Sequence, residues 1–158
     1  KNYSNHLKDK YDFLSFEDNM HLEHSTETQA PFIKHYFSDA SIVEIVYGKM
    51  SYEGLSLLID EVLEDEDNLL VISTDLSHFY TQEKANELDN ICLNAIAKKD
   101  LALFDKGCEA CGKVGVKAVI KSAIKKGFDT KVLHYCTSYN KTKDASRVVG
   151  YASALIGN

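Results

Sequence analysis

The sequence has no tryptophan, a single proline and no apolar run that approaches the roughly 18 residues of a membrane-spanning helix. No signal peptide is visible either. Positive charge is also scarce, because 24 acidic residues outnumber 18 basic ones and leave a net charge of −6. This balance disfavours nucleic acid and anionic membranes as partners. We therefore predict a cytoplasmic protein that binds neither nucleic acid nor membrane.

An initiator methionine is missing as well, since the chain begins at Lys1, and we expect the true N-terminus to have been removed. The 158 residues, of which 44% are hydrophobic, suffice for one domain with a sizeable core. No internal repeat, low-complexity tract or linker divides them. We expect residues 1–158 to form a single domain.

The four cysteines are Cys92, Cys108, Cys111 and Cys136, and in an acidic intracellular protein we expect them to be reduced. Cys108 and Cys111 form a Cys-x-x-Cys pair. No second pair or histidine pair accompanies it to complete a structural zinc site. A thioredoxin-like redox pair would follow an early strand, whereas this one follows a helix. Whether Cys108 takes part in a site stays open.

Hydrophobic spacing predicts alternating strands and helices after a polar, irregular leader at residues 1–23. Near Thr28 a helix begins, or kinks at Pro31, with an inward face made of Phe32, Ile33, Tyr36 and Phe37. The further elements are strands at Ser41–Tyr47 and Leu69–Ile72, helices at Tyr52–Leu63, Gln82–Lys98 and Lys113–Lys126, and a final hairpin of Lys131–Ser138 and Val148–Ile156. This order predicts an α/β fold with a mixed β-sheet flanked by helices, parallel early and antiparallel at its end.

Asp75 and His78 follow directly after the apolar run Leu69–Ile72. Such a run is typical of a strand buried on both faces, and ligands bind beyond the carboxyl ends of these strands in open α/β sheets. The two side chains are therefore candidates for proton transfer or substrate binding. The structural alternative is that Asp75 caps a short turn and pairs with His78.

Two further residues are candidates for chemistry. Cys111 lies at the start of the predicted Lys113–Lys126 helix, where the helix dipole favours a thiolate that can act as nucleophile or metal ligand. The alternative is an inert buried thiol. His24 is flanked by Glu23 and Glu27, and carboxylates can hold a histidine in one tautomer for metal or acid–base chemistry. Taken alone, His24 fits a surface capping residue better than a site residue.

Several ordered motifs resemble those of one known family. They are the Glu-His-Ser-x-Glu-x-Gln-x-Pro-Phe run at residues 23–32, Ser-Thr-Asp-Leu-Ser-His at 73–78, Ala-Cys-Gly at 110–112, and Tyr-x-Thr-Ser at 135–138 followed by Val-Val-Gly-Tyr-Ala at 148–152. Together they resemble the Memo family, named after a mediator of cell motility, whose bacterial members are called AmmeMemoRadiSam system protein B. The resemblance covers nearly the whole chain from about Asp18 onward.

The resemblance implies a fold distantly similar to the class III extradiol dioxygenases, which are non-haem iron enzymes. Family members look like metal-binding proteins with a pocket ligated by two histidines and one cysteine. Cys111 matches that cysteine, so it is the expected metal ligand, with iron or copper as the expected ion. Asp75, His78 and His24 match polar residues in or around the pocket and are the expected catalytic residues.

The chain departs from the family pattern in one important respect. The family's two histidine ligands lie in Pro-His-Ala-Gly-type and Ser-His-His-type motifs, and neither occurs here. We therefore expect the sequence to be the C-terminal portion of a longer Memo-like chain. The absent part would supply sheet strands, so apolar surface is expected to be covered by self-association or by pairing with that part.

Three hypotheses remain open at this point. The first is a metal-dependent, dioxygenase-like oxidoreductase in which Cys111 binds the metal and Asp75 and His78 orient substrate or relay protons. The second is a protein that binds a peptide or small molecule in the same pocket without turnover. The third is an α/β domain without a site, in which Cys111 reacts no faster with thiol reagents than Cys92 or Cys136.

Overall fold

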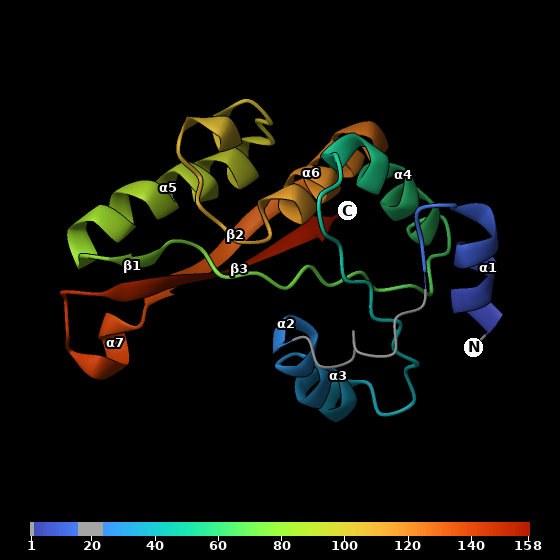
Figure 1. Ribbon diagram of the computed structural model, residues 1–158, viewed down its shortest axis with the longest axis horizontal. Coiled ribbons are helices and arrows are strands. Elements are labelled where there is room, and N and C mark those ends of the chain that lie inside the picture. Colours follow the sequence, from blue (N-terminus) through green and yellow to red (C-terminus); the bar gives the residue numbers. More distant parts are fainter. Residues whose placement is uncertain (1, 16–23) are drawn as a thin grey trace. The chain divides into compact units, whose positions relative to one another are not determined.

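A computed structural model describes residues 2–15 and 24–158 of the chain (Figure 1). The chain divides into two compact units, Lys1–Gly48 and Lys49–Asn158. Each unit is described by itself. The expected single domain over residues 1–158 stays a prediction.

The first unit is helical where an irregular leader was expected. Helix α1 spans Asn2–Lys10 and carries Lys8 and Lys10 in its last turn, where positive charge complements the helix dipole. The leader prediction is therefore wrong for residues 2–10, because polar residues with helix-favouring charges at the C-terminal end suffice for a short helix. The remainder of the predicted leader, at residues 16–23, lies outside the described residues.

Two more short helices follow in this unit, α2 (His24–Glu27) and α3 (Ala30–Tyr36). Pro31 lies in the first turn of α3, where its missing N–H is not needed. The predicted inward face is wrong, because the side chains of Phe32, Tyr36 and Phe37 are exposed. Helical spacing identifies a common face but does not supply a surface against which that face can pack.

The strand predicted at Ser41–Tyr47 is also absent, since these described residues are extended without strand pairing. β-Branched residues favour an extended backbone, but a strand exists only when a neighbouring strand accepts its hydrogen bonds. Within the described part of the first unit no such neighbour occurs, and Ile42, Val43 and Val46 stay exposed.

The second unit contains the α/β fold that the sequence predicts, with a sheet flanked by helices. Its helices are α4 (Tyr52–Val62), α5 (Gln82–Lys98), α6 (Lys113–Lys126), a 3-10 helix at Leu103–Lys106, and the short α7 (Tyr139–Thr142). Its strands are β1 (His78–Tyr80), β2 (Asp129–Thr137) and β3 (Val148–Gly157). The strand order is β1-β3-β2, and both pairings are antiparallel.

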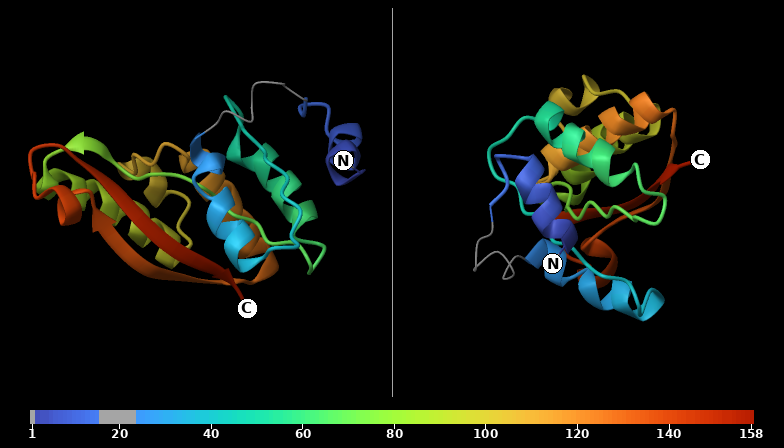
Figure 2. Two further views of the ribbon diagram at one scale, coloured as in Figure 1. Left: turned by 90° about the horizontal axis from the view of Figure 1, so that it is seen from below. Right: turned by 90° about the vertical axis from the view of Figure 1, so that its right-hand side faces the viewer.

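Local sequence explains why the three long helices begin and end as predicted. The Ser51 hydroxyl accepts the Gly54 N–H at the start of α4, and the Thr81 hydroxyl accepts the Lys84 N–H at the start of α5. Helix α6 ends at Gly127, whose φ of 73° is a left-handed conformation that glycine adopts without strain. Helix α5 packs on the β2–β3 hairpin, and α4 packs on α6 (Figure 2).

The hydrophobic core of this unit lies where α5, α6 and the 3-10 helix meet the segment that precedes β1. Its buried members are Leu76, Cys92, Ala95, Phe104, Cys108, Ala110, Val116 and Ile120, and Tyr135 and Ile156 of the hairpin pack against them. The core thus fixes both Leu76 and Cys108–Ala110, and these two segments flank the candidate site residues.

The strand predicted at Leu69–Ile72 is not formed. Its residues are extended but unpaired, with Leu69 68% and Val71 44% exposed. The expectation of early parallel strands is wrong for the described residues, because the pairing begins only at His78 and is antiparallel. An apolar run specifies burial, but the partner strand must come from elsewhere in the fold.

The expectation that all cysteines are reduced is also wrong. Cys92 of α5 and Cys108 form a disulfide bond, whereas Cys111 and Cys136 are free. Cys108 is therefore bonded to α5 and not to its Cys-x-x-Cys neighbour. The sequence could not pair these cysteines, because Cys92 and Cys108 approach each other only when the 3-10 helix folds back along α5.

Among the described helices none is long and apolar enough to cross a membrane. This finding agrees with the absence of a long apolar run in the sequence.

The disulfide closes a loop of 16 residues, and its removal should destabilise the folded chain. We expect Cys92→Ala to lower the free energy of unfolding by about 3 kcal/mol in urea denaturation, since cross-linking limits the unfolded chain. Cys136→Ala is the matched control and should change it far less. Alkylation without reductant should modify only Cys111 and Cys136, with Cys111 faster because it is exposed. Modification of all four cysteines would contradict the bond.

Candidate functional site

The segment at residues 73–78 brings two candidate side chains together. Its backbone bonds to β3, because the Leu76 N–H donates to the Gly150 carbonyl at 2.9 Å and the Gly150 N–H donates to the Ser77 carbonyl at 3.0 Å. Leu76 and Ser77 are buried, while Asp75 and His78 on either side stay partly open to solvent. The backbone therefore holds both functional groups at the edge of the core.

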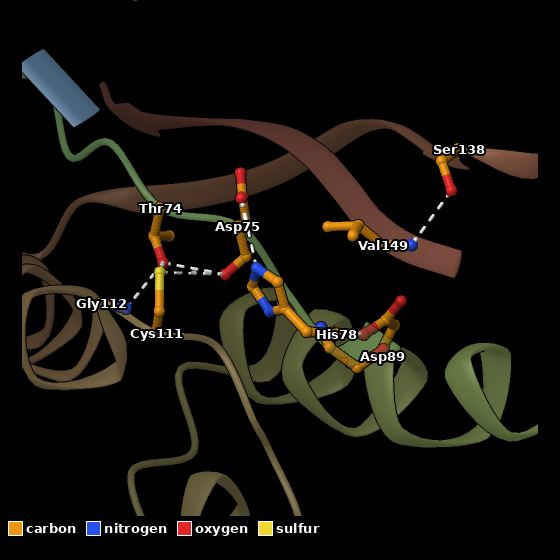
Figure 3. Close-up of polar contacts among 9 residues, drawn as sticks. Thr74, Asp75, His78, Asp89, Cys111, Gly112, Ser138 and Val149 are labelled. Atoms are coloured by element: carbon orange, nitrogen blue, oxygen red, sulfur yellow. Dashed lines mark hydrogen bonds and ion pairs between the residues drawn. The ribbon is translucent and has the colours of Figure 1, made fainter. Parts of the chain in front are cut away.

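Asp75 and His78 form a direct contact, which is the pairing that the structural alternative expects. The Oδ2 atom of Asp75 lies 3.3 Å from Nε2 of His78, and the two side chains are 47% and 33% exposed (Figure 3). A partly exposed carboxylate–imidazole pair can exchange a proton with solvent or with a bound molecule. Asp75 does not cap a helix, so the contact is not a by-product of capping.

Cys111 contacts the same segment from the loop before α6. Its Sγ atom lies 3.3 Å from the Thr74 hydroxyl and 3.9 Å from the Asp75 carbonyl oxygen (Figure 3). The thiol is free and exposed, so the alternative of an inert buried thiol is wrong. Cys111, Asp75 and His78 thus form a continuous line of contacts, although Cys111 is 36 residues from Asp75 in the chain.

Thr74 joins the two halves of this site. Its Oγ1 atom accepts the Gly112 N–H at 2.7 Å and donates to the Asp75 carbonyl at 2.9 Å. A hydroxyl has one proton and two lone pairs, so the same O–H group can turn to donate to a Cys111 thiolate. Gly112 precedes α6 and has no side-chain cap of its own, so Thr74 satisfies a backbone donor there.

His24 lies in the first unit, apart from the other predicted site residues in the chain. Its ring is 90% exposed, and its Nδ1 atom contacts the Glu27 carboxylate at 3.2 Å. Glu23, the other predicted flanking carboxylate, lies outside the described residues. The contact with Glu27 is as the sequence predicts, and a catalytic role for His24 stays a prediction.

Two tyrosines of the hairpin belong to the surroundings of the site, and sequence reasoning assigned them no role. Burial, and after it the charge of Asp75, raise the pKa of Tyr151 above its ordinary value. Burial and a hydrogen bond to Asp89 raise the pKa of Tyr135.

Asp89 could have been identified from the sequence, because a carboxylate on the apolar face of a predicted helix signals a buried polar network.

The described residues contain no group of three His, Cys, Asp or Glu side chains arranged to hold a metal. The donor set therefore fits a metal only in part. Cys111 offers one exposed thiolate, a soft ligand suited to copper, iron or zinc. A surface depression between α4 and α6, lined by residues that include Leu57, Asp60 and Ile124, contains none of Asp75, His78 and Cys111.

Comparison with known proteins gives consistent matches. The family model described as "Memo-like protein" matches residues 1–155. A MEMO1 family protein of Methanococcus maripaludis is 34% identical over 98% of the chain and 60% of its own length. Its counterparts from Methanobrevibacter smithii and Aquifex aeolicus are 33% and 35% identical, over 91% and 92% of the chain and 55% and 59% of their own lengths. The chain thus spans about 60% of the curated relatives it matches.

The Thr74 hydroxyl should contribute measurably to the stability of the site. We expect Thr74→Val, which keeps the shape of the side chain, to lower the free energy of unfolding by about 1–2 kcal/mol, because the Gly112 N–H loses its acceptor. The measurement is urea denaturation, with the Gly112 amide resonance as a local reporter.

The matched control is Thr142→Val, whose exposed hydroxyl donates to the Ser138 carbonyl and accepts the Asp144 N–H, so that water can replace both bonds. It should change stability by less than about 0.5 kcal/mol. Equal losses in the two variants would show that Thr74 has no special role in joining the two segments.

Proposed function

The chain belongs to the Memo-like protein family, and from this membership and the site geometry we propose that it contributes to a metal-dependent, dioxygenase-like oxidoreductase pocket. The observation that carries the proposal is the contact line from Cys111 through Thr74 and Asp75 to His78. An exposed free thiol beside a carboxylate–imidazole pair combines a soft metal ligand with a group that moves protons.

In this proposal Cys111 binds the metal as its thiolate. The sulfur is accessible, and Cys108 cannot compete for the ion because its sulfur is bonded to Cys92. The Thr74 hydroxyl is placed to donate a hydrogen bond to the thiolate, and such outer contacts orient a metal ligand. Since the described residues offer no complete ligand set, the other ligands must come from outside them. Bound iron or copper would supply redox chemistry.

The chain's own residues would handle protons and orientation. His78 can hold a proton on Nε2 and share it with Oδ2 of Asp75 at 3.3 Å. Partial exposure lets this pair reach a bound molecule. Tyr151 adds a protonated phenol near Asp75. His24 completes the proposed catalytic residues, as the family resemblance implies.

A second function is non-catalytic binding of a peptide or small molecule by the same residues. The observation in its favour is that Asp75 and His78 are half-exposed and able to recognise a polar or cationic group without a metal. The two functions differ in whether the metal is required.

Metal content tests the role of Cys111. In the protein at its native length, we expect Cys111→Ala to lose most of the iron or copper that wild type retains after dialysis, measured by inductively coupled plasma mass spectrometry. A thiolate ligand that is removed cannot be replaced by the alanine methyl group. Cys136→Ala, the other free cysteine, is the matched control and should keep its metal. Equal metal content in wild type and Cys111→Ala would contradict the assignment.

Calorimetric titration with peptides of different charge, with and without metal, tests the second function. If the pocket binds them, Asp75→Ala or His78→Ala should weaken binding by about tenfold or more, because a charged contact is lost. Asp129→Ala, an exposed carboxylate at the start of β2, should leave the affinity unchanged. Affinity that is indifferent to Asp75 and His78 would count against binding at this site.

A further inference from the structure

Asp89 of α5 is a buried carboxylate directly behind the Asp75–His78 segment. The residue is fully buried, yet both of its oxygens have donors. Oδ1 accepts the Ser77 N–H at 2.8 Å, and Oδ2 accepts the Tyr135 O–H at 2.8 Å. A carboxylate removed from water is tolerated only with such donors. Asp89 therefore has a specific structural task that an apolar residue could not perform.

Gly150 leaves room for this carboxylate. A Cβ atom at position 150 would overlap the Asp89 side chain, so glycine is required for the close approach of β3 to α5. The Gly150 backbone in turn bonds to Leu76 and Ser77. Three elements that are distant in the sequence therefore meet at Ser77.

Ser77 is held there through its backbone. Its N–H donates to Asp89, its carbonyl accepts from Gly150, and its buried Oγ atom has no hydrogen-bond partner in the part of the chain that the structure describes. Ser77 lies between Asp75 and His78 in the chain. The segment before it, from residue 68, has no strand pairing, and the backbone bonds of Leu76 and Ser77 to Gly150 join it to β3.

We propose that Asp89 is a positioning residue that fixes the backbone at Ser77 and thereby holds Asp75 and His78 in contact. The functional value of this contact rests on the proposed function, but the geometry that the inference predicts can be tested without metal or substrate. Tyr135 supports the carboxylate, because its single phenol proton lies between Oδ2 of Asp89 at 2.8 Å and, at the longer distance of 3.0 Å, Oδ1 of Asn86 on α5.

The experiment measures amide hydrogen exchange at Ser77 and the ring resonances of His78 by NMR, in metal-free protein. In Asp89→Ala we expect exchange at Ser77 to become faster by at least about tenfold beyond any change in global stability, because its acceptor is lost. The His78 ring resonances should shift toward those of an Asp75→Ala variant. Asp89→Asn should restore most of both signals, since an amide oxygen still accepts the Ser77 N–H.

The matched control is Asp60→Ala, which removes another largely buried carboxylate, paired with Lys125 between α4 and α6. It should lower stability without moving the Ser77 or His78 signals. Should Asp89→Ala fail to fold, Tyr135→Phe removes one donor to the same carboxylate and should shift the signals in the same direction by less. Wild-type signals in the folded variants would overturn the proposal, whereas a failed metal assignment for Cys111 would leave this result unaffected.

Discussion

A carboxylate can be buried only where hydrogen-bond donors replace water, and Asp89 places this constraint at the centre of the second unit. Its donors come from the backbone before β1 and from the phenol on β2, while β3 passes close by at a residue without a side chain. Helix α5 and all three strands must therefore reach their positions together. The same constraint places the Asp75–His78 pair at the edge of the core. There Asp89 binds the backbone between the two residues, and their side chains are partly exposed to solvent.

The thiol half of the site depends on a second, weaker constraint. The loop before α6 is attached to α5 by the disulfide at Cys108 and to the opposite segment by the Thr74–Gly112 hydrogen bond. Cys111 lies between these two attachments with its sulfur exposed. Rigid attachment on both sides suits a residue that must present one atom in a fixed place, as a metal ligand does.

The chain belongs to the Memo-like family and matches only part of the length of its relatives. The matched relatives are longer, and the chain spans about 60% of them. The described residues contain an exposed free thiol and a carboxylate–imidazole contact but no group of three metal-binding side chains. The exposed apolar positions at Leu69 and Val71 are consistent with this picture, because a sequence selected for burial on both faces is here without a pairing partner.

The sequence by itself determined the long helices, the final hairpin, the Asp75–His78 pair and the family, because helical spacing, capping residues and short motifs are local and persist in any context. Only the tertiary structure decided which extended segments became strands, since pairing requires a neighbour that the local sequence does not contain. It also decided that Cys108 bonds to Cys92 and that Thr74 joins Gly112. These contacts link residues 16 and 38 positions apart, and the roles of Asp89 and Gly150 arise only where such distant segments meet.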